Sequence, residues 1–351
     1  MVVAEELAHY NSILPYLIKK GRTPHLLVGN GFSMAYDHKI FSYNALYNFI
    51  DGLEDHFLSR LFGIIKTKNF ELVMQQLDNF CELIEVFGSD ETLLDKVKEA
   101  SANLKSSLIN AVGSLHPEHV FKIPDDESEN CASFVSSYLD NNGSIFSTNY
   151  DLLLYWVLMR NNLKRHVDGF GREREDDEED FSTDPEYTEL RWGPNKSRQN
   201  TFYLHGALPL FDTGIHIVKE EYDSSGYLLE NIERRMEKSE YPIFVAAGNG
   251  DEKLNHILHN RYLTYCYEAL CNIEGSLVTF GFNFGEYDHH IIDAVNIAAK
   301  QGKRVGNKLF SIYIGIYSEE DRNHIEKIRN KFKCKVNLFN AKTADVWRKN
   351  T

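Results

Sequence analysis

The sequence lacks long apolar runs and cysteine pairs with metal-ligand spacing. A helix that spans a bilayer needs about 20 consecutive apolar residues, and no segment of the chain reaches that length. Its 5 cysteines show no C-x-x-C spacing, so we expect reduced thiols and no structural zinc ribbon. Residues 1–17 do not combine a basic leader with an apolar core. We therefore expect a soluble, cytoplasmic protein without a membrane partner.

Positive charge is also in short supply. The chain has 38 Lys and Arg against 52 Asp and Glu, a formal net charge of −14. This balance argues against a broad nucleic-acid footprint, and no carboxylate cluster has the metal spacing expected of a nucleic-acid processing enzyme. With 351 residues, the chain is long enough for one large domain with an insertion, or for two domains.

Short apolar runs alternate with helical patterns along the chain. The expected strands are His25–Val28, Ser144–Ser147, Thr201–Leu204, Pro242–Ala247, Ser276–Phe280, Leu309–Ile316 and Lys335–Phe339. The expected helices cover residues 1–24, 43–53, 152–159, 254–270, a segment from 288, and 319–332. Because no hairpin signature interrupts this alternation, we predict an α/β fold: a Rossmann-like, doubly wound parallel sheet with helices on both faces.

The fold is predicted to carry a helical insertion. From Phe70 onward, apolar residues recur at spacings of three and four through two long helical stretches. We assign residues 1–50 and 141–351 to the Rossmann-like domain and 51–140 to an inserted helical cap. The cap could be a lid over a nucleotide, or a packing or oligomer surface. The acidic run within the loop 171–200 is typical of a solvated loop.

The earliest strand ends in a glycine turn. It is followed by Gly29, Asn30, Gly31, Phe32 and Ser33. Bare backbone at such a turn can approach a phosphate, and the start of a helix attracts anions. Met34 stands where the dinucleotide fingerprint would place a third glycine. We expect the backbone of this segment to hold a diphosphate.

Three later strands also end in polar or glycine clusters. These clusters are Ser147-Thr148-Asn149-Tyr150-Asp151, Leu204-His205-Gly206 and Gly281-Phe282-Asn283-Phe284-Gly285-Glu286-Tyr287-Asp288. In parallel sheets, ligands bind at the carboxyl ends of the strands. The four clusters are therefore expected to share one edge of the sheet.

In their order along the chain, the four clusters resemble the motifs of the sirtuin-like family. The resemblance covers roughly residues 25–320 and is closest to the bacterial sirtuin-like NAD hydrolases of anti-phage defence. It implies NAD as substrate. The sequence departs from the deacylase pattern, because Met34 to His38 replace the expected Ile-Pro-Asp-Phe-Arg segment and the zinc-binding cysteine pairs are absent. Both departures disfavour protein deacylation and leave NAD cleavage.

Three residues are candidates for the chemistry. Cleavage of the nicotinamide–ribose bond passes through an oxocarbenium-like state, so the site must hold the ribose and remove a proton. His205 suits a general base near neutral pH, and Asn149 can orient water or the ribose hydroxyls. Asp151 can add negative charge near the developing cation. A core histidine at His205 and a helix cap at Asp151 are the structural alternatives.

The last cluster is the candidate for the adenosine half of NAD. Gly281, Phe282 and Asn283 are expected to face it, with Asn283 on a ribose hydroxyl, although an ordinary βα turn would look the same. Asp288 belongs to this segment and is a candidate for NAD binding, and a cap on the next helix is its structural alternative. We expect no metal here, because the adjacent histidines His289 and His290 would point to different faces of that helix.

The functional hypothesis is an NAD+ hydrolase that releases nicotinamide and ADP-ribose as an abortive-infection effector. Such an activity needs restraint, so we expect homo-oligomerisation, a partner protein such as an ATPase, or a nucleotide signal. One alternative is a non-catalytic sensor of NAD or an ADP-ribose derivative. A protein deacylase is the other.

Overall fold

The protein is described by a computed structural model. It describes residues 7–38, 60–61, 63–64, 70–88, 91–114, 116–172, 189–222, 226–245, 250–300 and 308–348. The helix predicted at 43–53 and most of the acidic run lie outside these residues. In the described part of the chain, no helix combines the length and the apolar content needed to cross a membrane.

The centre of the molecule is a parallel sheet of 7 strands, in the order β1-β12-β11-β10-β2-β3-β6. Its strands are β1 (Ala8–His9), β2 (Pro24–Val28), β3 (Ile145–Ser147), β6 (Thr201–Tyr203), β10 (Gly275–Phe280), β11 (Leu309–Ile316) and β12 (Lys335–Asn340). Every neighbouring pair is parallel. All residues of β2, β3, β6 and β10 are buried, as expected for strands covered on both faces. The predicted Rossmann-like sheet is confirmed.

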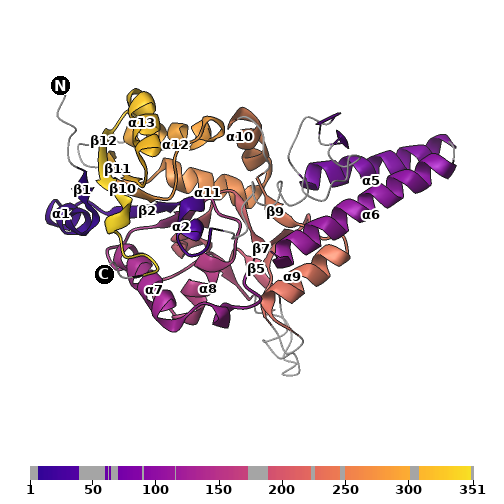
Figure 1. Ribbon diagram of the computed structural model, residues 1–351, viewed down its shortest axis with the longest axis horizontal. Helices are drawn as coiled ribbons and strands as arrows, with labels where there is room; N and C mark the ends of the chain where they lie inside the picture. Colours follow the sequence, from indigo (N-terminus) through magenta and orange to yellow (C-terminus); the bar gives the residue numbers. More distant parts are fainter. Residues whose placement is uncertain are drawn as a thin grey trace.

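Helices cover both faces of this sheet. They include α1 (Ile13–Lys19), α2 (Asn30–Met34), α7 (Asp125–Leu139), α8 (Leu153–Arg160), α10 (Gly250–His259), α11 (Arg261–Cys271), α12 (His289–Lys300) and α13 (Glu319–Ile328). In Figure 1, α11 and α12 lie on one side and α7 and α8 on the other. Single 3₁₀ turns are η1 (Tyr10–Ser12), η2 (Val120–Lys122), η4 (Lys196–Arg198), η5 (Glu286–Asp288), η6 (Arg329–Lys331) and η7 (Ala341–Thr343).

Two predicted helices have different bounds. The first is shorter than expected, because β1 and η1 precede α1. The segment 254–270 is divided into α10 and α11 at Asn260. The Asn260 side chain accepts the backbone N–H groups of Tyr262 and Leu263 at 3.0 and 3.1 Å, so it caps a new helix and breaks the apolar pattern in two.

A second, antiparallel sheet was not predicted. Its strands are β4 (Phe170–Gly171), β5 (Leu190–Trp192), β7 (Gly206–Asp212), β8 (Ile217–Lys219) and β9 (Pro242–Phe244), in the order β4-β5-β8-β7-β9. The run expected to join the parallel sheet at Pro242 instead pairs antiparallel with β7. The turn between β7 and β8 contains Gly214 without an Asn-Gly or Asp-Gly pair at its centre, so it gave no short hairpin signal.

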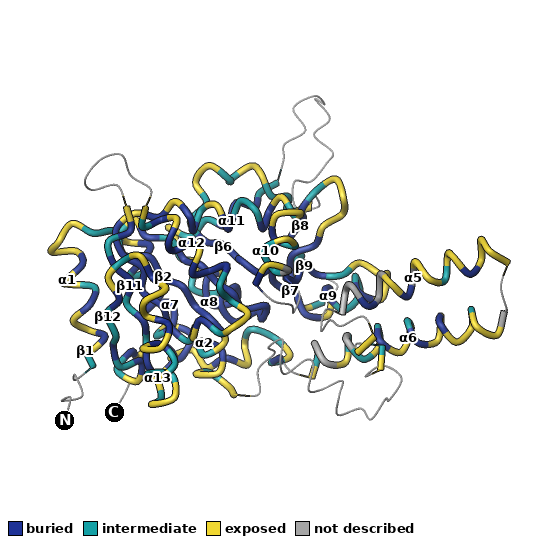
Figure 2. The backbone as a smooth tube through the Cα atoms, turned by 90° about the horizontal axis from the view of Figure 1, so that it is seen from above, coloured by how far each residue is buried: buried dark blue, intermediate teal, exposed yellow. Residues whose placement is uncertain are grey.

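Helices α5 (Phe70–Phe87) and α6 (Glu91–Ser114) form a hairpin that projects from the body (Figure 1). The two predicted helices are confirmed. Val73, Leu77, Ile84, Val97 and Leu104 are buried, while the far end of the hairpin is largely exposed (Figure 2). The base of α6 contacts α9 (Leu228–Glu237). By contrast, α7 packs on β2 and β3, so it forms part of the layer that covers the sheet.

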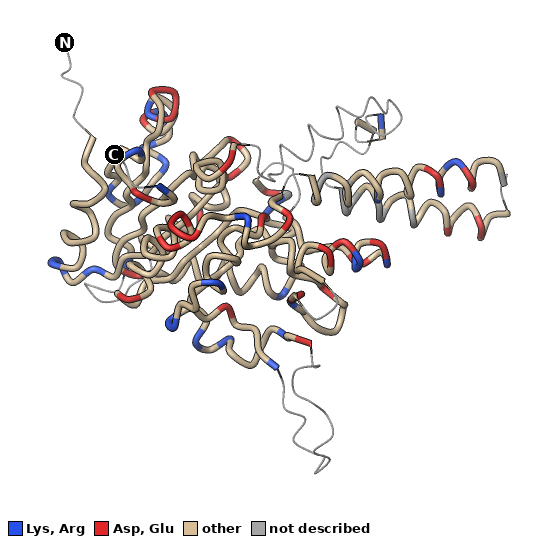
Figure 3. Tube along the Cα trace, turned by 60° about the horizontal axis from the view of Figure 1, so that its bottom comes forward, with Lys and Arg blue, Asp and Glu red and all other residues tan. Residues whose placement is uncertain are grey.

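Charged residues of both signs are interspersed over the described chain (Figure 3). One ion pair is buried beside the second sheet: Lys219 Nζ lies 2.5 Å from Asp168 Oδ2, and both side chains are less than 10% exposed (5% and 8%). The Lys219 ammonium and His166 hold the pKa of Asp168 below its usual range despite burial of the carboxyl group. This pair anchors β8 to the segment that leads into β4.

The tight turn at Gly206 joins the two sheets. Gly206 has φ +83°, and a Cβ there would lie 1.8 Å from the carbonyl oxygen of Ile243 in β9. Gly214 has a similar φ of +81°, but a Cβ there would have no other atom within 4 Å. A side chain at Gly214 would therefore meet backbone strain alone, whereas one at Gly206 would meet the same strain and a steric clash.

We expect Gly206→Ala to lower the free energy of unfolding by more than about 3 kcal/mol, since a backbone shift adds to a strain of about 1–3 kcal/mol. Gly214→Ala should cost only the strain, about 1–2 kcal/mol. Urea unfolding of both variants measures the difference. Equal losses would show that β9 does not constrain this turn.

Candidate active site

The four clusters identified in the sequence follow four adjacent strands, β10, β2, β3 and β6. Their ends are level: Phe280 pairs with Val28, Val28 with Ser147, and Ser147 with Tyr203. The chain runs outward from β2 through β3 to β6, and later through β10 to β11 and β12. The boundary between β2 and β10 is therefore the topological switch point, where ligands bind in open α/β sheets.

The glycine turns after β2 and β10 pack directly against each other. The Gly31 N–H donates to the Gly281 carbonyl oxygen at 2.8 Å, and the Gly29 N–H donates to Phe280 O at 3.1 Å. A Cβ on Gly29 or Gly31 would lie 2.7 Å from atoms of Gly281. The Phe32 N–H is bonded to Gly29 O at 2.8 Å. The glycines are thus needed for close backbone contact. Three of the five amides expected to face a diphosphate, those of Gly29, Gly31 and Phe32, are hydrogen-bonded within the protein.

Some side chains of these two turns are buried in the core and others are exposed at the surface. Phe32 and Phe282 are buried, whereas Asn30 and Asn283 are exposed. The Phe32 carbonyl oxygen accepts the indole N–H of Trp347 at 2.8 Å. From this edge, Asn30 and Asn283 are the side chains that can reach a ligand over the turns.

Asn149, Ser33 and Asp151 form one buried hydrogen-bonded network. The Ser33 hydroxyl donates to Asp151 Oδ2 at 2.5 Å and accepts from Asn149 Nδ2 at 2.8 Å. Because the single hydroxyl proton of Ser33 points to the Asp151 carboxylate, a lone pair of the hydroxyl oxygen faces the Asn149 amide. Asp151 Oδ1 also accepts the Leu153 N–H at 3.0 Å, which gives it the predicted role at the start of α8. The Asp151 carboxyl group, 2% exposed, therefore acts on Asn149 through Ser33.

Burial changes the protonation of this carboxyl group. The loss of solvent raises the pKa of Asp151 to about 6, against the opposing hydrogen bonds from Ser33 and the backbone of Leu153. Near neutral pH, Asp151 thus carries its negative charge at a cost, in a buried position beside Ser33.

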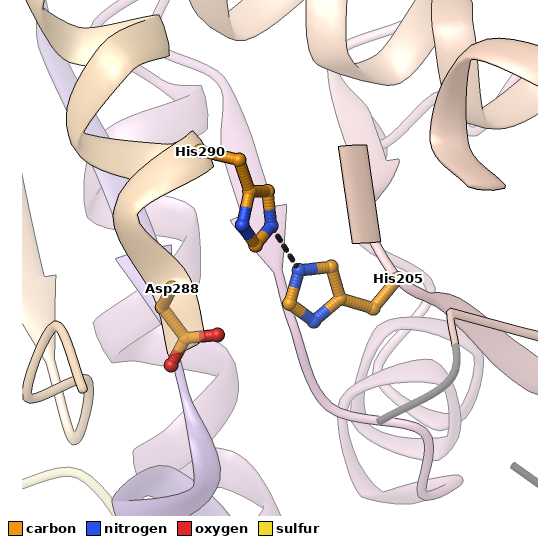
Figure 4. Close-up of side chains that lie close together, drawn as sticks. All are labelled: His205, Asp288 and His290. Atoms are coloured by element: carbon orange, nitrogen blue, oxygen red, sulfur yellow. Dashed lines mark hydrogen bonds between the residues drawn. The ribbon is translucent and has the colours of Figure 1, made fainter. Parts of the chain in front are cut away.

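His205 lies close to His290 in the first turn of α12 and to Asp288 at the end of η5. Its Nε2 lies 2.9 Å from Nε2 of His290, and both imidazoles are buried. Asp288 approaches the pair from the start of α12 (Figure 4). Lys253 Nζ of α10 lies 2.7 Å from Asp288 Oδ1. His205 itself is fixed by its backbone, because its carbonyl oxygen accepts the Val245 N–H at 2.8 Å.

Both histidines are neutral at physiological pH. Burial, and next the Lys253 charge, hold the pKa of His205 well below its usual range. Burial followed by the neighbouring His205 does the same to the pKa of His290. Two neutral imidazoles share one proton across the 2.9 Å contact. If His205 is the donor, the lone pair of its second ring nitrogen, which points away from His290 in Figure 4, can accept a proton.

Tyr150 connects the network with the histidine pair. Alternation along the extended segment turns Asn149 and Asp151 toward Ser33, while the Tyr150 ring lies 6.5 Å from the ring of His205. The Tyr150 hydroxyl donates to Val245 O at 2.6 Å. The two groups of polar side chains are therefore neighbours on one edge of the sheet.

His290 and Lys253 were not selected from the sequence. His289 and His290 do point to different faces: His289 lies beside Asp251, its Nε2 3.5 Å from Oδ1. The argument from neighbouring positions missed that His290 meets His205, which is 85 residues away along the chain. The approach of the first turn of α12 to the end of β6 is a tertiary contact, and the sequence pattern carries no signal for it.

A family model, the domain of unknown function DUF4917, matches residues 26–347. The chain belongs to the DUF4917 family. The match runs from β2 to Trp347, so it includes all four strand ends and the tryptophan that bonds to Phe32. A comparison with curated proteins gives no match.

The raised pKa of Asp151 predicts a pH-dependent stability. Between about pH 4 and about pH 6 the folded protein binds this proton more tightly than the unfolded chain, so stability falls as pH rises through this window. A shift from 3.8 to about 6 corresponds to about 3 kcal/mol. Asp151→Asn lacks the titration, so the stability of the wild type relative to this variant should fall by that amount between about pH 4 and about pH 7.

Chemical unfolding at a series of pH values measures the effect. The comparison with Asp151→Asn cancels the other titrating groups. A difference that is constant with pH would show that Asp151 keeps an ordinary pKa in the folded state.

Proposed function

We propose that this DUF4917 protein hydrolyses NAD+ at the nicotinamide–ribose bond and releases nicotinamide and ADP-ribose. The observation that carries the proposal is the buried Asn149–Ser33–Asp151 network beside His205, at the switch point of a Rossmann-like sheet. The same strand ends carry the motifs that resemble sirtuin-like NAD hydrolases.

Asn149 is the proposed ligand of the ribose or of the attacking water. Its amide is oriented by Ser33, which is in turn oriented by Asp151. A carboxamide held by a buried network loses little rotational freedom when it binds a hydroxyl group, and such positioning lowers the barrier. In this proposal Asp151 is a positioning residue, and its charge does not contact the developing cation.

His205 is the proposed general base. A neutral imidazole can take a proton from the attacking water or from a ribose hydroxyl while the glycosidic electrons leave with nicotinamide. The resulting imidazolium would lie near the Asp288 carboxylate, which favours the charged form. His290 holds the ring through its Nε2 contact, and the proposed base requires the tautomer in which His205 donates through Nε2. Asn30 and Asn283 are the proposed contacts for the rest of the dinucleotide.

We further propose that the enzyme is a cytoplasmic effector of anti-phage defence. NAD depletion is toxic to the cell that performs it, so the activity must be restrained until infection. Homo-oligomerisation or a regulatory partner such as an ATPase would provide that restraint. The projecting α5–α6 hairpin offers a surface for either.

Purified protein is expected to release nicotinamide from NAD+. His205→Ala and Asn149→Ala should each lower kcat by about 10²-fold or more, the usual contribution of a positioned base. His289→Ala, on the other face of α12, is the matched control and should keep full turnover. Nicotinamide release is followed by chromatography, and circular dichroism checks the fold of each variant.

Three results would count against the proposal. Binding of NAD+ without nicotinamide release would favour the sensor. Unchanged turnover in His205→Ala would remove the base from the mechanism. Release of O-acyl-ADP-ribose from an acylated peptide would instead identify a deacylase.

A further inference from the structure

We propose that His205, His290 and Asp288 form a binding site for a divalent transition-metal ion, with Zn²⁺ the best fit. One potential ligand atom from each residue lies within 4.8 Å of the others. The three come from two different elements, the β6–β7 turn and the start of α12, and they face one another in Figure 4. Imidazole and carboxylate are ordinary zinc ligands, and three protein ligands with an open fourth position define a reactive type of zinc site.

The distances fit an ion after small side-chain rotations. Ligand atoms about 2.0–2.1 Å from a tetrahedral ion lie about 3.3 Å apart. The two Nε2 atoms are 2.9 Å apart, and the separations within the cluster do not exceed 4.8 Å. An ion between them would therefore push the imidazoles slightly apart and draw the carboxylate inward.

Hydrogen-bond accounting is compatible with an ion. Each neutral imidazole has one N–H and one lone pair. In the direct contact, one histidine donates through Nε2 and the other accepts, and Nδ1 of His290 is buried without a partner. With an ion between the rings, both Nε2 lone pairs bind the ion and each ring carries its proton on Nδ1. Only the histidine that donates through Nε2 in the direct contact has to move its proton. The change needs a tautomer shift and no net release of a proton.

Lys253 limits the affinity of the site. Its ammonium group lies 2.7 Å from Asp288 Oδ1, which leaves Oδ2 for an ion, and its charge opposes the approach of a cation. Three ligands and a nearby ammonium predict an exchangeable ion. A permanently bound structural ion would have four ligands.

This chemistry would regulate the activity proposed above, and that part of the inference rests on the proposed function. With Nε2 of His205 on the metal and a proton on Nδ1, neither nitrogen can accept a proton. The ion and the base chemistry therefore compete for the same imidazole, so zinc should switch the enzyme off reversibly.

Direct binding tests the site without reference to NAD. Zn²⁺ is titrated calorimetrically into the metal-stripped chain, and we expect one site that depends on His290. His290→Ala and His290→Gln should each weaken it by at least about 10-fold, the lower bound for loss of a second-shell partner of a metal ligand. His289→Ala is the matched control and should bind as the wild type does. Lys253→Met should bind more tightly, because it removes the opposing charge. The visible spectrum of bound Co²⁺ reports a low-coordinate nitrogen and oxygen site.

Equal zinc binding by wild type and both His290 variants would overturn the site, as would weaker binding by Lys253→Met. The two proposals can fail separately. His290-dependent zinc binding without nicotinamide release would keep the site and remove the enzyme. Nicotinamide release that zinc does not inhibit, in a protein that binds zinc through His290, would keep both and remove the regulation.

Discussion

The backbone contact between the two glycine turns holds the site together. The hydrogen bond from Gly31 to Gly281 joins the first half of the sheet to the second at the point where the strand order reverses. Any side chain at Gly31 would enter the Gly281 backbone. Because α12 begins shortly after the second turn, this contact also sets where Asp288 and His290 stand relative to the ends of β2, β3 and β6. The first role of these glycines is therefore to allow the geometry of the protein, and contact with a ligand comes second.

The polar side chains buried at the strand ends form hydrogen bonds in two separate sets. Asp151 and Asn149 share Ser33, while His205 shares a proton with His290, whose Nδ1 has no partner. Removing one member of a set would leave a further buried polar group without a partner, which costs about 1–3 kcal/mol. These hydrogen bonds also restrict the motion of the side chains. Rigid polar groups at a crevice are suited to binding and to catalysis, since little reorganisation is left to occur during the reaction.

The sheet was predictable because its strands are short apolar runs that end in glycine or polar residues, and parallel strands need no other signal. The order of the four clusters indicated a common edge, and the register places Val28, Ser147 and Tyr203 in one row. The antiparallel sheet was missed because its turns lack the residue pairs that mark hairpins. His290 and Lys253 were missed because their partners are distant in sequence, and neither residue type stands out without the fold.

The charges of the site are only partly compensated. Asp288 is matched by Lys253 at 2.7 Å and the two histidines are neutral, whereas Asp151 is ionised near neutral pH against a pKa that burial raises to about 6. The part of the site around His205 thus has little net charge of its own. A cation that enters such a site is held by lone pairs more than by charge. A proton from the substrate and a metal ion are both cations of this kind, and His205 has one imidazole to offer them. Under the two proposals made above, the neutral imidazole that accepts a proton is also the one that would bind the metal ion, so catalysis and inhibition by metal would involve the same buried ring.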